Sequence, residues 1–236
     1  MSDKKDVTRP ASRNLVDSFL DQAKRLAPSE GGASRPRLVF ALDATMSRQP
    51  TWDLACRVQG EMFATAAGIG GLTVQLVYFR GFNECRASRW VVDAGALTGL
   101  MTQIRCRGGQ TQIARVLRHV RKEAAEQLVK VLVYVGDAME EPIDSLCALA
   151  GELGLVGIKA FMFHEGTDPA AARAFKEVAR LTGGAYARFD ASAPNALSDL
   201  LRAAAAYAAR GAEGLARLAP DSDGARLLLA SMKGHA

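Results

Sequence analysis

Continuous apolar runs constrain the fold of this chain more than any other feature. The clearest lies at 131–136, where Val-Leu-Val-Tyr-Val contains no polar residue in alternation. A strand with one side in water alternates apolar and polar residues, whereas a strand of a parallel sheet is covered on both faces and does not. Comparable runs, rich in apolar, β-branched or aromatic residues, occur at 37–42, 72–79, 157–163 and 185–189. These runs predict the strands of a buried, mostly parallel sheet.

Helical patterns separate the runs. Over 113–124, apolar residues recur at i, i+3, i+4, i+7 and i+11, which places them on one face of a helix. A second pattern begins at Asp168-Pro169 and ends at Gly183-Gly184, a typical start and stop pair. Further patterns lie at 54–63 and 197–208. The alternation predicts an α/β fold, a doubly wound, mostly parallel sheet with helices on both faces.

One strand is expected to run the other way. Trp90-Val91-Val92 follows a polar stretch at 81–89 that is predicted to be a loop. This loop is too short to hold a helical crossover, which a parallel connection needs. We therefore expect one short antiparallel strand at the edge of the sheet.

The chain divides into three predicted regions. Residues 1–36 mix charged side chains with proline and glycine, which is typical of a tail or linker, and 15–26 can form a short amphipathic helix. Residues 37–210 contain all the expected strands and form the α/β domain. Residues 211–236 carry leucine-rich stretches interrupted at Pro220 and are predicted to be a helical extension that packs on the domain.

Composition narrows the classes of function. No stretch approaches about 20 uninterrupted apolar residues, and the polar first residues lack the centre of a secretory signal, so we expect a cytoplasmic protein with no membrane partner. The net charge of +5 favours acidic partners but is too small to indicate nucleic-acid binding. The four scattered cysteines have no zinc-site spacing and are expected to be reduced core thiols, and His119 to be a solvated surface residue.

Polar side chains follow two of the predicted strands and precede one helix. Asp43, Thr45 and Ser47 come after the run at 37–42, Asp137 follows the run at 131–136, and Thr111 precedes the helix at 113. Ligands of open α/β sheets bind at this edge, beyond the carboxyl ends of the strands. In an extended segment, residues two apart point the same way, so the first three can converge on a hard cation.

The same residues also fit a purely structural interpretation. Serine and threonine favour the position before a helix, and Pro50 suits a first helical turn, so the first segment can be a strand end running into a cap. Thr111 or Asp137 alone can likewise cap a helix at a strand-to-helix turn.

Taken together, the three segments resemble the von Willebrand factor A (VWA, integrin I-like) domain family over about residues 36–210. The metal-ion-dependent adhesion site (MIDAS) of that family uses a D-x-S-x-S segment, a threonine in a later glycine-rich loop and an aspartate after the fourth strand. Here these correspond to DATMS with Asp43, Thr45 and Ser47, to GGQT with Thr111, and to VYVGDA with Asp137. Thr45 departs from the usual serine: it keeps the hydroxyl and adds a methyl group beside the ion, so we expect metal binding with altered affinity.

The resemblance implies a non-enzymatic protein that recognises a partner protein through a divalent cation. Hydroxyl and carboxylate oxygens suit Mg²⁺, the first choice, or Mn²⁺ or Ca²⁺. In the family, a glutamate or aspartate of the partner completes the coordination shell. Arg48, Arg105 and Arg107 flank the ligands and can steer an acidic partner, while Glu140 and Glu141 are expected to be a solvated helix start.

Two alternatives stay open. A metal-free VWA scaffold is suggested by Thr45 alone. A phosphatase of the haloacid dehalogenase type also begins with an aspartate at a strand end, but it needs a second aspartate as acid and base at the position of Thr45. Gly108-Gly109 can bring the loop close to the ion or allow a turn with positive φ.

Overall fold

The computed structural model describes residues 35–67, 71–126, 129–190 and 193–234. The chain divides between Ser34 and Arg35 into two units, and the architecture below is that of the second. The helix expected at 15–26 lies outside the described residues. No helix of the described ranges is both long and apolar enough to cross a membrane.

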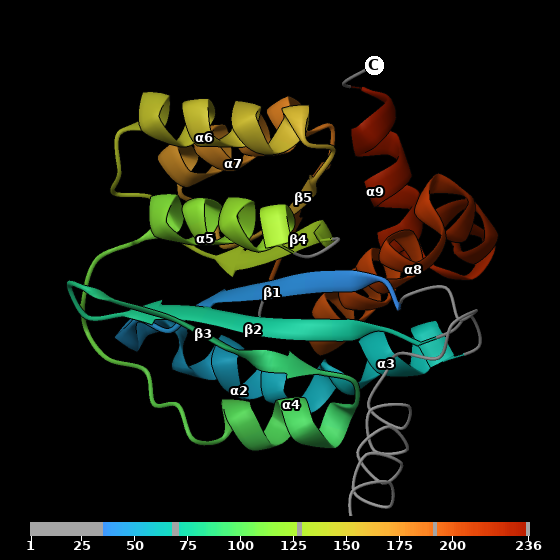
Figure 1. The fold of residues 1–236 in the computed structure, drawn as a ribbon, viewed down its shortest axis with the longest axis horizontal. Coiled ribbons are helices and arrows are strands. Elements are labelled where there is room, and N and C mark those ends of the chain that lie inside the picture. Colours follow the sequence, from blue (N-terminus) through green and yellow to red (C-terminus); the bar gives the residue numbers. More distant parts are fainter. Residues whose placement is uncertain (1–34, 68–70, 127–128, 191–192, 235–236) are drawn as a thin grey trace, which may run out of the picture. The chain divides into compact units, whose positions relative to one another are not determined.

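Six strands form one sheet in the order β3-β2-β1-β4-β5-β6. Strands β1 to β5 are labelled in Figure 1. All neighbours pair in parallel except β2 and β3, which are antiparallel. The doubly wound α/β fold with one antiparallel edge strand is thereby confirmed. The strands are β1 (Arg37–Asp43), β2 (Thr73–Arg80), β3 (Glu84–Val91), β4 (Val129–Gly136), β5 (Lys159–Glu165) and β6 (Ala185–Phe189).

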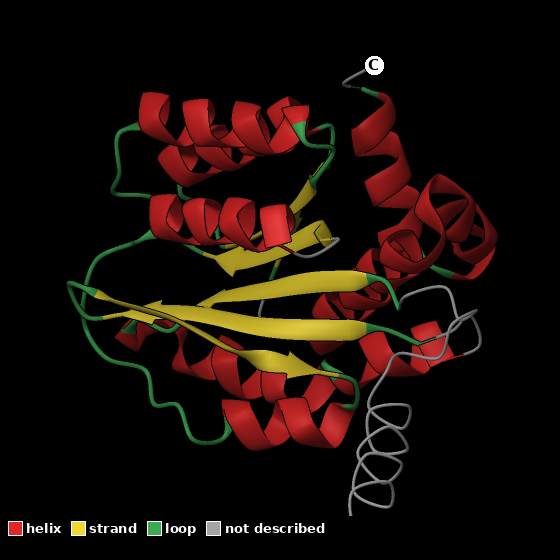
Figure 2. Ribbon diagram, viewed as in Figure 1, coloured by secondary structure: helices red, strands yellow, loops and turns green. Residues whose placement is uncertain are grey.

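Helices cover both faces of the sheet (Figure 2). One face carries α5 (Ile113–Glu126), α6 (Ile143–Leu155) and α7 (Pro169–Thr182). The other carries α2 (Gln49–Val58), α3 (Gly60–Ala67), α4 (Ala94–Met101), α8 (Pro194–Leu218) and α9 (Asp223–Lys233). Two short 3₁₀ helices, η1 (Met46–Arg48) and η2 (Ala219–Asp221), precede α2 and α9.

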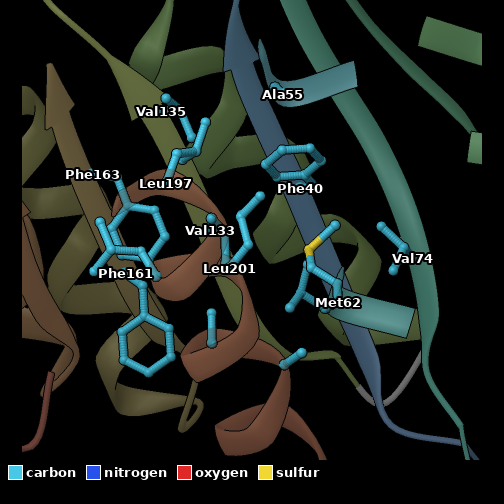
Figure 3. Packing of buried hydrophobic residues seen from close by; sticks show 14 of the residues in the cluster. Phe40, Ala55, Met62, Val74, Val133, Val135, Phe161, Phe163, Leu197 and Leu201 are labelled. Atoms are coloured by element: carbon cyan, nitrogen blue, oxygen red, sulfur yellow. The ribbon is translucent and has the colours of Figure 1, made fainter. Parts of the chain in front are cut away.

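The uninterrupted apolar runs are explained by two cores. In β4, Val133 and Val135 belong to the core beneath α2, α3 and α8, whereas Leu132 and Tyr134 belong to the core beneath α5, α6 and α7. Successive side chains of a strand point to opposite faces, so a strand covered twice needs apolar residues at every position. Figure 3 shows the first core, in which Phe40 and Val133 lie near Met62 and Leu201.

Outside the candidate site, two expectations from the sequence were wrong. Most of the polar stretch at 81–89 is not a loop: β3 begins at Glu84, and only a turn at 81–83 joins it to β2. His119 is not a solvated surface residue but half-buried, with its Nε2 atom 2.8 Å from Oε1 of Gln75. Burial lowers the pKa of His119.

The C-terminal helices pack on the domain. Helix α8 contains a break at Gly211, where φ is 64°, a conformation that glycine adopts without a Cβ penalty. Asp199 of α8 accepts hydrogen bonds from Ser222 Oγ (2.7 Å) and from the backbone N–H of Gly224 (2.6 Å) at the start of α9. Helix α9 then lies against β6, where Ser231 Oγ accepts a hydrogen bond from the backbone N–H of Tyr186 (3.1 Å).

Candidate metal centre

The first segment of the candidate site begins where β1 ends. Asp43 is the last residue of the strand and is only 3% exposed. Its Oδ1 atom accepts a hydrogen bond from the backbone N–H of Thr45 (2.7 Å), which turns the chain back over the carboxylate. Thr45 is extended, with φ −70° and ψ 164°, and η1 starts at the next residue. This local turn holds Asp43 and the two hydroxyl residues that follow it in one short loop.

The hydroxyls of that loop reach the end of β4. The Oγ atoms of Thr45 and Ser47 lie 3.5 Å apart, and Ser47 Oγ donates a long hydrogen bond to Asp137 Oδ2 (3.4 Å). Asp137 follows Gly136, the last residue of β4, which pairs directly with β1. The two segments therefore meet because their strands are neighbours in the sheet.

Thr111 comes from the loop between α4 and α5. Its backbone N–H donates to Glu140 Oε2 (2.9 Å), and its Oγ1 accepts from the backbone N–H of Glu140 (3.0 Å). A hydroxyl oxygen has two lone pairs, so one remains for a second interaction. This reciprocal pair ties the loop to the segment after β4.

Gly109 is required by close packing. A Cβ atom at this position would lie 2.1 Å from the carbonyl oxygen of Gly81, in the turn after β2. Neither Gly108 nor Gly109 has positive φ, so the alternative of a positive-φ turn is wrong. Next to them, Arg107 N–H donates to the Ala44 carbonyl (3.0 Å), which joins this loop to the loop after β1.

All five predicted ligand residues line one cavity of about 260 Å³. Its other lining residues are Met46, Gly108, Gly109, Ala138 and Glu140. In the described ranges, no three histidine, cysteine, aspartate or glutamate residues are grouped as they would be in a metal site made of those residues alone. A cation here would depend on the hydroxyls as well as on the two carboxylates.

Arg48 occupies a position that the sequence did not predict. It was expected to flank the site and face an acidic partner, but it is only 2% exposed. Its Nη1 atom forms an ion pair with Glu165, at the end of β5, and its Nε atom lies 3.8 Å from Asp137 Oδ1. Thr51 Oγ1 also donates to the Glu165 carboxylate. Arg48 is thus an internal cation beside one of the candidate ligands.

Glu140 and Glu141 do not start a helix, because α6 begins only at Ile143; Glu140 is exposed, as expected, whereas Glu141 is partly buried. The Glu141 carboxylate accepts hydrogen bonds from the backbone N–H groups of Ile113 (2.5 Å) and Ala114 (2.9 Å). The first N–H groups of a helix have no partner within the helix, and a carboxylate there also interacts favourably with the helix dipole. Both glutamates therefore hold the Thr111 loop and the start of α5 in place.

The carboxylate of Asp43 is buried at the edge of the cavity. Burial raises the pKa of Asp43 to about 6, although the hydrogen bond from Thr45 acts in the opposite direction. A buried carboxylate is costly unless a positive charge or hydrogen bonds compensate it. The oxygens of Asp43, Asp137 and the three hydroxyls are hard donors of the type that Mg²⁺, Mn²⁺ and Ca²⁺ prefer, so the residues fit such an ion.

Comparison with known proteins assigns the fold. No protein-family model and no curated protein sequence matches the chain. Among solved structures, the VWA domain of SpRpn10 is similar with a TM-score of 0.53 and 12% identity, over 66% of this chain and 88% of that one. The chain therefore has the fold of a VWA domain, as its sequence motifs predicted.

Two further structures with this fold carry metals. Proximal thread matrix protein 1 from the mussel byssus, in a structure with a zinc-occupied MIDAS motif, has a TM-score of 0.52 and 15% identity, over 72% of this chain and 48% of that one. Manganese-loaded TRAP protein of Plasmodium vivax has a TM-score of 0.51 and 11% identity, over 67% and 69%. At these identities the likeness establishes the fold alone.

Proposed function

We propose that this protein binds a divalent cation, Mg²⁺ first, through Asp43, Thr45, Ser47, Thr111 and Asp137, and that the ion recognises a carboxylate of a partner protein. One observation carries the proposal: five oxygen-bearing side chains from three separate segments line a single cavity at the carboxyl edge of the sheet. The metals in two solved structures of the same fold support a divalent cation in general.

The number of donors supports an open site. Mg²⁺ takes six oxygen ligands and Ca²⁺ six to eight, so about five protein oxygens leave at least one position for water or a partner. Three of the five are neutral hydroxyls, which moderates the negative charge that the protein gives the ion. A glutamate or aspartate side chain of a partner is a hard oxygen donor that suits the remaining position.

The chemistry of the site supports recognition and not turnover. A phosphatase of the haloacid dehalogenase type needs an acid two residues after its nucleophile, and Thr45, which stands there, cannot transfer a proton as a carboxylic acid does. A metal-free VWA scaffold is the second candidate, and Arg48 favours it. Its guanidinium lies 3.8 Å from Asp137 and supplies a positive charge without a metal.

Thermal unfolding with Mg²⁺ or Mn²⁺, compared with EDTA, separates the candidates. An ion that binds only the folded protein raises Tm in a concentration-dependent way. We expect this shift for the wild type, its loss in Asp43→Asn, and its retention in Asp144→Asn, which removes an exposed carboxylate from α6. No shift in the wild type would support the scaffold, and Asp43-dependent hydrolysis of a generic phosphate ester would support the phosphatase.

Partner recognition needs its own experiment. Proteins captured on the wild type with Mg²⁺ should be released by EDTA and should not bind Asp43→Asn. A partner that binds both variants equally, with or without EDTA, would refute recognition through the metal.

A further inference from the structure

Three arginines share a single carboxylate beside the candidate metal centre. Glu84 Oε1 lies 2.9 Å from Arg80 Nη2 and 3.4 Å from Arg86 Nε, and Glu84 Oε2 lies 3.8 Å from Arg107 Nη1. We call Arg80, Glu84, Arg86 and Arg107 the hairpin cluster. One carboxylate balances one guanidinium, so the cluster has an excess of two positive charges.

This arrangement differs from other surface ion pairs of the described chain. Three of these, Arg121–Glu152, Arg180–Glu177 and Arg217–Glu213, each join one arginine to one glutamate. In the hairpin cluster, Arg86 and Arg107, whose side chains are 70% and 67% exposed, instead share the single carboxylate of Glu84 with Arg80. Arg86 and Arg107 are therefore available to carboxylates of another molecule.

The hairpin cluster is attached directly to the loops of the metal centre. Arg107 precedes Gly108, which lines the cavity, and the Arg107 backbone N–H is bonded to Ala44, next to Asp43. Arg80 Nη1 donates to the carbonyl of Arg105 (2.6 Å), and the carbonyl of Gly81 accepts from the N–H of Gln110 (3.2 Å). The hairpin and the glycine-rich loop thus form one continuous surface. An extended peptide, which spans about 3.3 Å per residue, can contact both with a few residues.

Two large apolar side chains project from the same loops. Met46, which lines the cavity, is 62% exposed, and Phe82, in the turn between β2 and β3, is 70% exposed. Phe82 directly follows Gly81, whose backbone packs against Gly109. Aromatic residues, methionine and arginine are enriched in protein interfaces relative to the rest of the surface. Met46 lines the cavity, while Phe82, Arg86 and Arg107 lie on the hairpin and the loop that are bonded to its edge, and this arrangement indicates a docking surface.

We propose that the partner presents an acidic segment with several carboxylates and an apolar side chain. One carboxylate completes the metal coordination, further carboxylates contact Arg86 and Arg107, and the apolar side chain packs on Phe82 or Met46. This inference rests on the proposed metal site. A nucleic acid fits less well, because its regularly repeated phosphates would also lie near Asp137 and Glu140 at the cavity.

A random dodecapeptide library displayed on phage, selected on the wild-type protein in Mg²⁺, provides the probe. We expect peptides with two or more acidic residues and an apolar residue to be enriched. The Kd of a synthetic copy is then measured for the wild type, for Arg86→Gln/Arg107→Gln and for the control Arg121→Gln/Arg217→Gln. The first double variant should weaken binding by about two- to thirtyfold, because two exposed ion pairs to the peptide are lost, and should reduce its salt dependence. The control should bind as the wild type does.

The outcomes separate this inference from the proposed function. Mg²⁺-dependent binding that Arg86→Gln/Arg107→Gln leaves unchanged would overturn the inference and leave the metal site intact. Enrichment of peptides without acidic residues, or tighter binding of a single-stranded oligonucleotide than of the peptide, would also overturn it. Arginine-dependent binding that survives EDTA would overturn the proposal that one peptide contacts both the metal and the arginines. The Tm shift with Mg²⁺ shows independently whether the ion binds to the protein.

Discussion

Replacement of Arg48 by methionine tests how much the internal cation stabilises the fold. The substitution leaves Glu165 and Asp137 without the guanidinium that lies between them, while it keeps most of the side-chain volume. Breaking a buried ion pair by removal of one partner costs about 3–5 kcal/mol. The carboxylates are 17% and 29% exposed, and water compensates part of the loss, so we expect a cost of about 2–4 kcal/mol.

Urea denaturation in EDTA measures this loss of unfolding free energy. A double-mutant cycle shows how much of the loss comes from the contact between Arg48 and Glu165. Arg48→Met, Glu165→Gln and the double variant are compared with the wild type. Because the two residues are in contact, the double variant should lose less stability than the sum of the single variants, by about 1–3 kcal/mol. Arg121→Met breaks an exposed pair and serves as the control, with an expected change of at most about 1 kcal/mol. If the losses of unfolding free energy in the two single variants were additive, or if Arg48→Met were as stable as the wild type, the ion pair of Arg48 with Glu165 would not stabilise the fold.

The same variant links the internal cation to the proposed metal. Without Arg48, a divalent ion is the remaining positive charge beside Asp137, so Mg²⁺ should raise the Tm of Arg48→Met more than that of the wild type. Equal shifts would show that Arg48 and the ion act independently.

Three further predictions concern the loops and one histidine. Gly109→Ala places a methyl group against the Gly81 carbonyl and should abolish the Tm shift with Mg²⁺, whereas Gly108→Ala, which has open space around it, should keep the shift. Glu141→Ala leaves two N–H groups at the start of α5 without their acceptor and should lower the free energy of unfolding by about 1–3 kcal/mol in urea; an unchanged midpoint would contradict this role. Burial lowers the pKa of His119 below its ordinary 6.5, so the unfolded chain takes up the proton first and stability should fall as pH drops below about 6.5. His119→Gln should flatten this part of the curve of unfolding free energy against pH, and an unchanged slope would count against it.

The sequence predicted the sheet and the location of the candidate site because local patterns determine both. Apolar runs such as the one in β4 identify strands covered on both faces, and polar residues after them must lie at the carboxyl edge. The five candidate ligands line one cavity, as this rule requires. Their role as ligands stays a prediction. The edge strand itself was predicted, but its first residues, 84–89, were expected to be a loop because an edge strand with exposed polar residues has the same composition as a loop.

The roles of Arg48, Glu140 and Glu141 depend on contacts that no local pattern encodes. Glu141 accepts from an N–H group 27 positions away, and Arg48 reaches a carboxylate on β5. The sequence held one weak indication of the role of Glu141. The helix at 113 follows a glycine-rich loop and begins after Gln112, which is not a favoured cap residue. An external acceptor for its first N–H groups could have been expected.

The contact of helix α9 with β6 has a consequence for self-association. A strand with free N–H and C=O groups at the border of a sheet can recruit a strand from another copy, and a helix laid against it prevents this. Ser231 already occupies the N–H of Tyr186, so β6 is protected, whereas β3 carries arginines that discourage pairing by charge. Helix α9 thus blocks strand pairing at β6, and electrostatic repulsion opposes strand pairing at β3. A protein shortened before residue 223 should aggregate by strand pairing at β6. High salt screens the arginine charges on β3 and should allow strand pairing there as well.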